Sequence, residues 1–112
     1  MASFTSGNIT QESWRFAYGA AVGSSRVVVA DGIEGKQYDD VERIIFSPDG
    51  RHLAYIGTSG GKTFMVLDGV EGKQYDDIVT RGGGRIIFNS SDSWHYLALK
   101  GNDVYLVEEN IE

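Results

Sequence analysis

"DGIEGKQYDD" at residues 31–40 returns as "DGVEGKQYDD" at residues 68–77, and only Ile33 and Val70 differ between the two copies. We call these two segments the repeated stretches. The segments before them match at the same offset of 37 residues: "WRFAYG" (14–19) with "RHLAYI" (51–56), and "RVVVADG" (26–32) with "TFMVLDG" (63–69). A fixed period of this length indicates an array of similar structural units.

A third and shorter copy follows. "RIIFSPDG" (43–50) matches "RIIFNSSD" (85–92) at an offset of 42, and the extra residues fall in the glycine-rich "TRGGG" (80–84). Glu109 stands where the earlier copies have Asp31 and Asp68, each at the start of an Asp-Gly turn. The sequence stops inside the corresponding turn of the third copy. The later segments match as follows: "HLAYIG" (52–57) with "YLALKG" (96–101), "TFMVL" (63–67) with "VYLVE" (104–108), and "ADGIE" (30–34) with "EENIE" (108–112).

Each copy consists of short apolar, β-branched runs separated by turn residues, and no segment has sustained helical periodicity. Four strands are expected per unit: "RIIF", "HLAYIG", "TFMVLDG" and "KQYDDI". A period near 40 with four strands is typical of β-propeller blades. The prediction is one all-β domain of about three four-stranded antiparallel propeller-like blades, the last lacking its outer strand, at approximately 1–42, 43–79 and 80–112.

The segment "RIIFSPDGRHLAYIG" (43–57) resembles the WD40-like repeat of TolB-type β-propellers, whose blades share an F-S-P-D-G-x-x-[LIV]-A-[FYV] pattern. The motif is complete only in the middle copy; the third copy has "NSSDSW" in its place and the first has the longer "TSGNITQES" (5–13). Pro48 presets φ for a tight turn that Asp49 and Gly50 complete, and Phe46 and Tyr55 are expected to face the stacked sheets. The resemblance implies a blade and leaves function open.

Composition excludes several classes of function. The net charge of −6 argues against nucleic-acid binding and against binding to an anionic membrane, since both need a basic surface. The absence of cysteine excludes disulfides and thiolate metal sites. No apolar run approaches the length of a membrane span, and residues 1–10 carry no signal-peptide pattern, so a cytoplasmic location is expected.

Side chains of the repeated stretches are the candidate binding residues. Their carboxylates suggest cation binding, but the spacing differs from a calcium loop and lysines lie among the acids, so no metal or cofactor is expected. An acidic rim with local turn bonds is the alternative. "GTSGGKT" (57–63) lacks the spacing of a phosphate-binding loop, and His52 and His95 are expected to lie far apart. The candidates are Asp31, Glu34, Lys36, Tyr38, Asp39, Asp40, Asp68, Glu71, Lys73, Tyr75, Asp76 and Asp77.

Three blades do not close a propeller, which has four to eight. Because Met1 opens the sequence, assembly is favoured over a fragment of a larger propeller, and a homo-dimer with six blades is the expected form. A compact sandwich of the same strands is a third outcome. The expected function is a non-enzymatic interaction or assembly module, with a protein partner as a further expectation. The alternatives are a propeller that binds a small ligand or carbohydrate and, less favoured, a hydrolase.

The near-identity of the repeated stretches has two interpretations. Asp-Gly supplies a turn with positive φ, and Tyr38 and Tyr75 offer large side chains to the neighbouring blade. That geometric role does not account for the retained Glu, Lys, Gln and Asp-Asp, because the strands around them have diverged. A surface presented twice for binding is the second interpretation.

Overall fold

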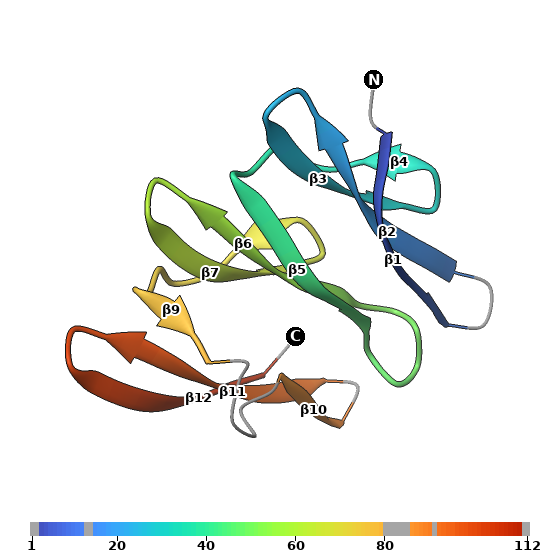
Figure 1. Ribbon diagram of the computed structural model, residues 1–112. Coiled ribbons are helices and arrows are strands. Elements are labelled where there is room, and N and C mark those ends of the chain that lie inside the picture. Colours follow the sequence, from blue (N-terminus) through green and yellow to red (C-terminus); the bar gives the residue numbers. More distant parts are fainter. Residues whose placement is uncertain (1–2, 13–14, 80–85, 91, 111–112) are drawn as a thin grey trace.

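The computed structural model describes residues 3–12, 15–79, 86–90 and 92–110. Its regular elements are β-strands in three antiparallel sheets that follow one another along the chain, which confirms the all-β prediction (Figure 1). The first sheet contains β1 (Ser3–Glu12), β2 (Arg15–Val22), β3 (Ser25–Ala30) and β4 (Ile33–Glu34); the second contains β5 (Asp40–Phe46), β6 (Leu53–Ser59), β7 (Lys62–Leu67) and β8 (Val70–Glu71); the third contains β9 (Asp77–Ile78), β10 (Ile87–Ser90), β11 (Ser93–Lys100) and β12 (Asp103–Asn110).

Equivalent hairpins relate the three sheets. Two-residue turns join β2 to β3, β6 to β7 and β11 to β12, and they make Val22, Ser59 and Lys100 equivalent. Residues 37 apart therefore correspond between the first two sheets, and residues 41 apart between the second and third. Between β5 and β10 the offset is 42, because Phe46 pairs with Leu53 as Phe88 pairs with Trp94. The expected match of 52–57 with 96–101 is wrong by three residues, because the turn at Gly101, with φ of 63°, fixes the register. Tyr55 corresponds to Tyr96, and both are buried.

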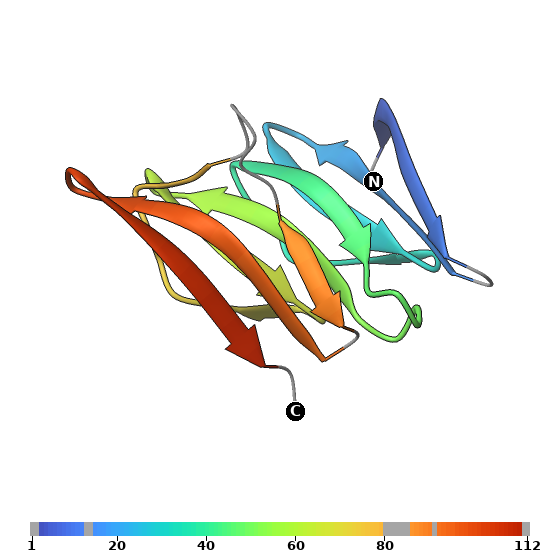
Figure 2. The same cartoon turned by 90° about the horizontal axis from the view of Figure 1, so that it is seen from below.

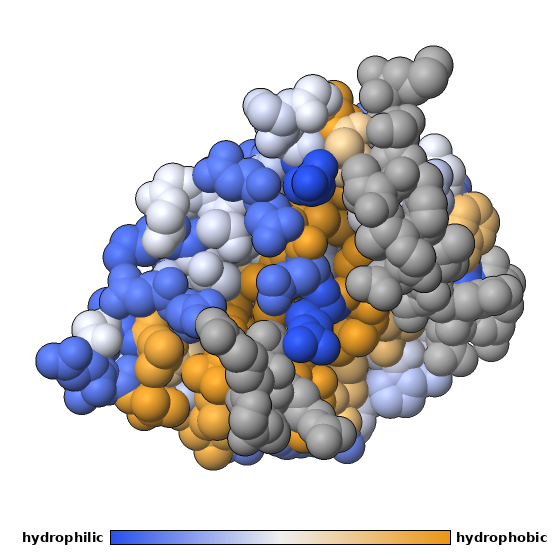
Figure 3. Space-filling model, in the orientation of Figure 1, coloured by the Kyte–Doolittle hydropathy of each residue, from blue (hydrophilic) through white to orange (hydrophobic). Residues whose placement is uncertain are grey.

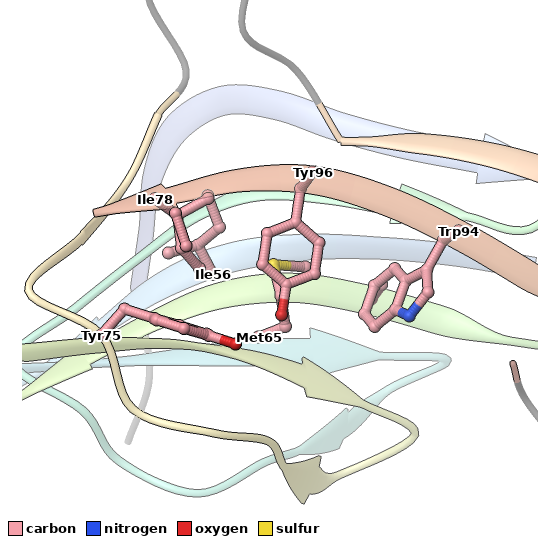
Figure 4. Close-up of a cluster of buried hydrophobic side chains, with 8 residues drawn as sticks. Ile56, Met65, Tyr75, Ile78, Trp94 and Tyr96 are labelled. Carbon is pink, nitrogen blue, oxygen red and sulfur yellow. The ribbon is translucent and has the colours of Figure 1, made fainter. Parts of the chain in front are cut away.

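The sheets stack face to face, and each of the two junctions holds a buried cluster (Figure 2). At the second junction Trp94 and Tyr96 point from β11 toward Met65 on β7 (Figure 4). The cluster between the first and second sheets contains Ala17, Val28, Tyr38, Leu53, Tyr55, Phe64 and Val66. The cluster between the second and third contains Ala54, Ile56, Met65, Tyr75, Ile78, Trp94, Tyr96 and Ala98.

The Pro48 turn forms as predicted. Gly50 has φ of 76° and donates its N–H to the Ser47 carbonyl at 2.9 Å, while the Asp49 carboxylate accepts from the Ser47 hydroxyl at 2.7 Å. Phe46 and Tyr55 pack into the first junction, as expected. In the first sheet the outcome differs: most of the segment 5–13, which aligns with this turn, belongs to β1 instead.

The predicted fourth strand at "KQYDDI" is wrong in position. The observed fourth strands are the two-residue β4 and β8, which lie earlier in each repeated stretch. Asp40 already belongs to β5 and Asp77 to β9, so the end of each repeated stretch opens the next sheet. In the third sheet β9 and β10 both pair with β11, on either side of residues 80–85. Within the described residues β12 pairs with β11 alone, in keeping with a missing outer strand.

Candidate functional site

Each repeated stretch is a connector between two sheets. After β4, Gly35 donates its N–H to the Val28 carbonyl at 2.9 Å, and Tyr38 exchanges two 2.8 Å backbone hydrogen bonds with Arg26 on β3. The next residue, Asp39, donates its N–H to the Thr58 carbonyl of the second sheet at 2.8 Å. The segment thus lines the outer edge of one sheet and then crosses to the inner edge of the next.

The second repeated stretch makes the same bonds one sheet further along. Gly72 donates to the Met65 carbonyl at 2.8 Å, Tyr75 pairs with Thr63, and Asp76 donates to the Leu99 carbonyl at 2.8 Å. This repetition explains why "KQYDDI" looked like a strand, since an extended backbone serves both edges. The segment pairs partly with one sheet and partly with the next, so only short strands form.

Asp31 and Asp68 begin the connectors at tight turns. Both have positive φ, 51° and 50°, as do the glycines after them, which is the conformation of a type I′ turn. Each carboxylate also bonds back to the start of the preceding strand pair. The Phe16 N–H donates to Asp31 Oδ1 at 3.1 Å, and the Leu53 N–H donates to Asp68 Oδ1 at 2.9 Å. The predicted Asp-Gly turn is confirmed, with these added bonds.

The paired aspartates at the end of each connector bind backbone N–H groups. The Gly60 N–H donates to Asp39 Oδ2 at 3.0 Å and the Gly101 N–H donates to Asp76 Oδ2 at 2.6 Å, each in a hairpin turn of the following sheet. Asp40 and Asp77 each accept the N–H of the next residue at 2.9 Å. These four carboxylates therefore attach the connectors to the following sheets and shape their backbone.

Glu71 joins the two repeated stretches to each other. Its Oε2 accepts from Lys36 Nζ at 2.8 Å and from the Tyr38 hydroxyl at 2.9 Å. The lysine and tyrosine of one copy thus bind the glutamate of the next. This contact between the two repeated stretches accounts for the retention of Glu, Lys and Tyr in both. No described contact explains Gln37 and Gln74.

Glu34 and Lys73 occupy the two open ends of this arrangement. Glu34 is equivalent to Glu71, and Lys73 is equivalent to Lys36, but neither side chain has a hydrogen-bond partner within residues 3–12, 15–79, 86–90 and 92–110. Tyr75 is buried at the second junction, 6.4 Å from the Tyr96 ring centroid in an edge contact. The structure therefore brings Lys36, Tyr38 and Glu71 together and leaves Glu34 and Lys73 at the surface.

Among the described residues, four carboxyl groups have a lowered pKa in the folded chain. A backbone N–H lowers the pKa of Asp31 and of Asp49, and a lysine ammonium lowers that of Glu71 and Asp76. A lowered folded-state pKa stabilises the fold above the ordinary carboxyl pKa, and this stabilisation is lost as pH falls through the lowered value. We therefore expect the free energy of unfolding to stay level near neutral pH and to fall below about pH 4.

Denaturant unfolding at a series of pH values checks this expectation, and NMR titration of the Glu71 side chain locates one source. In Lys36→Met the pKa of Glu71 should rise toward the ordinary glutamate value, because its first cause of lowering is removed. Lys73→Met is the matched control and should leave that pKa unchanged. A free energy of unfolding that rises on acidification would contradict the assignment.

Two cavities open at the sheet junctions, beside the turns that begin the connectors. The one between the second and third sheets has a volume of about 370 Å³, and so does the one between the first and second. The former is lined by His52, Met65, Leu67, Asp68, Val70, Glu71, Gly72, Trp94, Glu109 and Asn110; we call it the second-junction cavity. The latter, the first-junction cavity, is lined by Arg15, Val28, Ala30, Asp31, Ile33, Glu34, Gly35, Arg51, Leu53, Tyr55, Asp68 and Gly69.

Known families, curated proteins and solved structures give no match to this chain. The site is therefore judged on its own geometry. Within the described part of the chain there is no group of three or more His, Cys, Asp or Glu side chains that could hold a metal ion. The described residues also contain no helix that is long and apolar enough to cross a membrane.

Sequence reasoning missed three residues of the second-junction cavity: His52, Trp94 and Glu109. His52 Nδ1 lies 2.6 Å from Asp68 Oδ2, and Trp94 is buried against Phe88 and Tyr96. One signal was present, because Glu109 aligns with Asp31 and Asp68. The cavity itself could not be seen in the sequence, since it forms where a turn of one sheet meets the first strands of the next.

Proposed function

We propose that this chain is a non-enzymatic assembly module that self-associates through the outer faces of its first and third sheets. The observation that carries the proposal is the exposure of β12. Leu106 is 61% exposed, whereas its equivalents Met65 and Val28 are 1% and 2% exposed because the following sheet covers them. Figure 3 shows apolar side chains gathered along the lower edge of this view, over the third sheet.

The third sheet thus presents the kind of face that is covered at each internal junction. Ile87 is an exposed equivalent of Ile45, which packs into the second junction, and Val104 on β12 is exposed as well. An apolar face of this kind in a native protein marks an interaction site. The surface that fits it is the face by which the second sheet packs on the first and the third sheet packs on the second.

The outer face of the first sheet carries the equivalent positions, and on it Ala20, Val27 and Val29 are already buried within the chain, which leaves Phe16 as its open apolar side chain. Phe16 is 41% exposed there, and it is equivalent to the buried Leu53 and Trp94, which pack on the preceding sheet. Its ring stacks on Tyr18, 6.5 Å away between centroids. The third sheet of one copy is therefore complementary to the first sheet of another, which gives a head-to-tail contact.

A head-to-tail contact between two copies can close into a ring related by a twofold axis. Two three-sheet chains then supply six blades, within the usual range of four to eight for β-propellers. The resemblance of residues 43–57 to TolB-type blades supports this arrangement. A binding role is favoured over catalysis because the carboxylates of the repeated stretches are engaged in turn, hairpin and connector bonds.

Binding of a small ligand is the second candidate function, and the second-junction cavity is the observation that favours it. A carbohydrate usually stacks on an exposed aromatic face, but Trp94 turns nearly all of its surface to the protein interior. The carboxylates of the cavity wall favour a cationic ligand instead.

We expect light scattering to show a mass above that of one chain, and Leu106→Asp to shift the protein to monomer without unfolding it. The aspartate places a charge in the apolar contact, while in the single chain the site is exposed. Val70→Asp is the matched control, since Val70 is 70% exposed but lies on β8 of the middle sheet. A wild-type chain that stays monomeric up to about 1 mM would contradict the proposal.

A further inference from the structure

The two junction cavities are equivalent by the internal repeat. All ten lining residues of the second-junction cavity correspond to lining residues of the first-junction cavity, at offsets of 37 or 41. The shared members include the Asp-Gly turn residue, Asp31 in one and Asp68 in the other. The first-junction cavity is therefore a template within the same molecule for what the second can bind.

An arginine side chain lines the first-junction cavity and shows how this geometry recognises a guanidinium. Arg15 Nε lies 3.0 Å from Asp31 Oδ2, and a terminal nitrogen of Arg15 donates to the carbonyls of Gly50 and Arg51 at 3.0 and 3.1 Å. The guanidinium carbon also lies 4.9 Å from the centre of the Phe46 ring. A carboxylate, turn carbonyls and an aromatic ring are the groups that suit a flat, delocalised cation.

The second-junction cavity keeps the carboxylate and loses the cation. His52 takes the position of Arg15, and its shorter side chain reaches only Asp68. Three carboxylates, those of Asp68, Glu71 and Glu109, face this space, and its described lining contains no lysine or arginine. By contrast, Arg15 and Arg51 oppose the three carboxylates of the first-junction cavity.

Glu71 is already bonded from outside by Lys36 and Tyr38, so among the described residues the carboxylate of this cavity without a basic partner is that of Glu109. Glu109 has one described hydrogen bond, a 3.5 Å contact from the Tyr96 hydroxyl. Burial and the nearby Glu109 carboxylate raise the pKa of that tyrosine, in keeping with a site where negative charge dominates.

The aromatic component is also retained. Phe88 follows the repeat as the counterpart of Phe46, and it stacks on Trp94 with 5.6 Å between ring centroids. Trp94 replaces Leu53 in the lining and is 2% exposed, so it supports the cavity from behind. The second-junction cavity therefore has the anionic and aromatic groups of the first without the arginine.

We propose that the second-junction cavity binds an alkylguanidinium group, carried by a small molecule or by an arginine side chain of a peptide. The group takes the place that corresponds to that of Arg15 at the first junction, and it pairs with Asp68 and Glu109. The inference does not depend on self-association, because Leu106 and Phe16 are not among the lining residues.

The test is an NMR titration with agmatine at physiological ionic strength, read on the Trp94 indole N–H and assigned with Trp94→Phe. We expect saturable binding at one site, and affinity about tenfold weaker in Asp68→Asn and in Glu109→Gln, since each variant removes one charged hydrogen-bond partner. Asparagine retains an oxygen for the Leu53 N–H, so the turn should persist. Glu108→Gln is the matched control, because it removes the same charge from the neighbouring residue outside the cavity.

His52→Arg supplies the guanidinium from within the chain and should abolish agmatine binding while raising the melting temperature. 4-Aminobutylurea, which keeps the ammonium of agmatine and replaces its guanidinium by a neutral urea, should not bind. An acetylated Gly-Arg-Gly amide compared with agmatine distinguishes the two sources: tighter peptide binding assigns an arginine side chain, and tighter agmatine binding assigns a free small molecule. No saturable shift with either probe, equal loss in Glu108→Gln, or equal binding of 4-aminobutylurea would overturn the proposal. Binding that persists in monomeric Leu106→Asp separates it from self-association.

Discussion

Replacing Phe64 by alanine should lower the free energy of unfolding by about 3–5 kcal/mol, as large aromatic truncations in cores do. The side chain is 1% exposed and lies in the cluster between the first and second sheets, with its ring centroid 5.5 Å from that of Tyr38 in an edge contact. The packing around it is tight, because a Cβ added at Gly57 would lie 3.0 Å from the Phe64 ring. A domain of this size is stable by about 5–15 kcal/mol, so the loss is a large part of the total.

The internal repeat supplies the control for this experiment. Tyr105 occupies the position of Phe64 on β12 and is 45% exposed. Tyr105→Ala should therefore cost less than about 1 kcal/mol, since most of the truncated surface is already in water. Urea unfolding followed by tryptophan fluorescence measures both variants. Equal losses at the two positions, measured at a concentration where the chain is monomeric, would contradict the described difference in burial.

Local chemistry was enough to predict the turns of this fold. Asp31 and Asp68 with their glycines, and Pro48 with Asp49 and Gly50, form the expected turns because their conformations depend on adjacent residues. The apolar, β-branched runs likewise appear as β3, β6 and β7. The antiparallel class of each sheet follows from these turns, since two-residue connections join only antiparallel strands.

The connectors were misassigned because their partners are distant in the chain. Nothing near Tyr38 indicates that Glu71 accepts its hydroxyl, and nothing near Asp39 indicates that it receives the Gly60 N–H. The same limit hid the cavities, each of which needs two sheets in place. Most of the candidate residues attach one sheet to the next, and this role could be recognised only from the three-dimensional contacts.

Tyr38 is the residue on which the repeated stretch should depend most. It is 3% exposed, it packs edge-on against Tyr55 and Phe64, and burial together with the bond to Glu71 raises the pKa of its phenol. Tyr38→Ala should lower the free energy of unfolding by about 3–5 kcal/mol, because it removes a core ring and the anchor of the connector.

Tyr38→Phe separates the two contributions of this side chain. It keeps the ring and removes the hydroxyl, so the expected loss is about 1 kcal/mol, the usual net value of one hydrogen bond. If the Glu71 contact accounts for the retained Glu and Tyr, the loss should shrink in a Glu71→Ala background, because the acceptor is then already gone. Urea unfolding of the wild type, both single variants and the double variant provides the double-mutant cycle. Glu34→Ala is the matched control, because Glu34 is the residue equivalent to Glu71 and its side chain has no described partner. Additive losses for Tyr38 and Glu71 would show that the two copies do not support each other through this bond, and the identity of the repeated stretches would then need a binding partner to explain it.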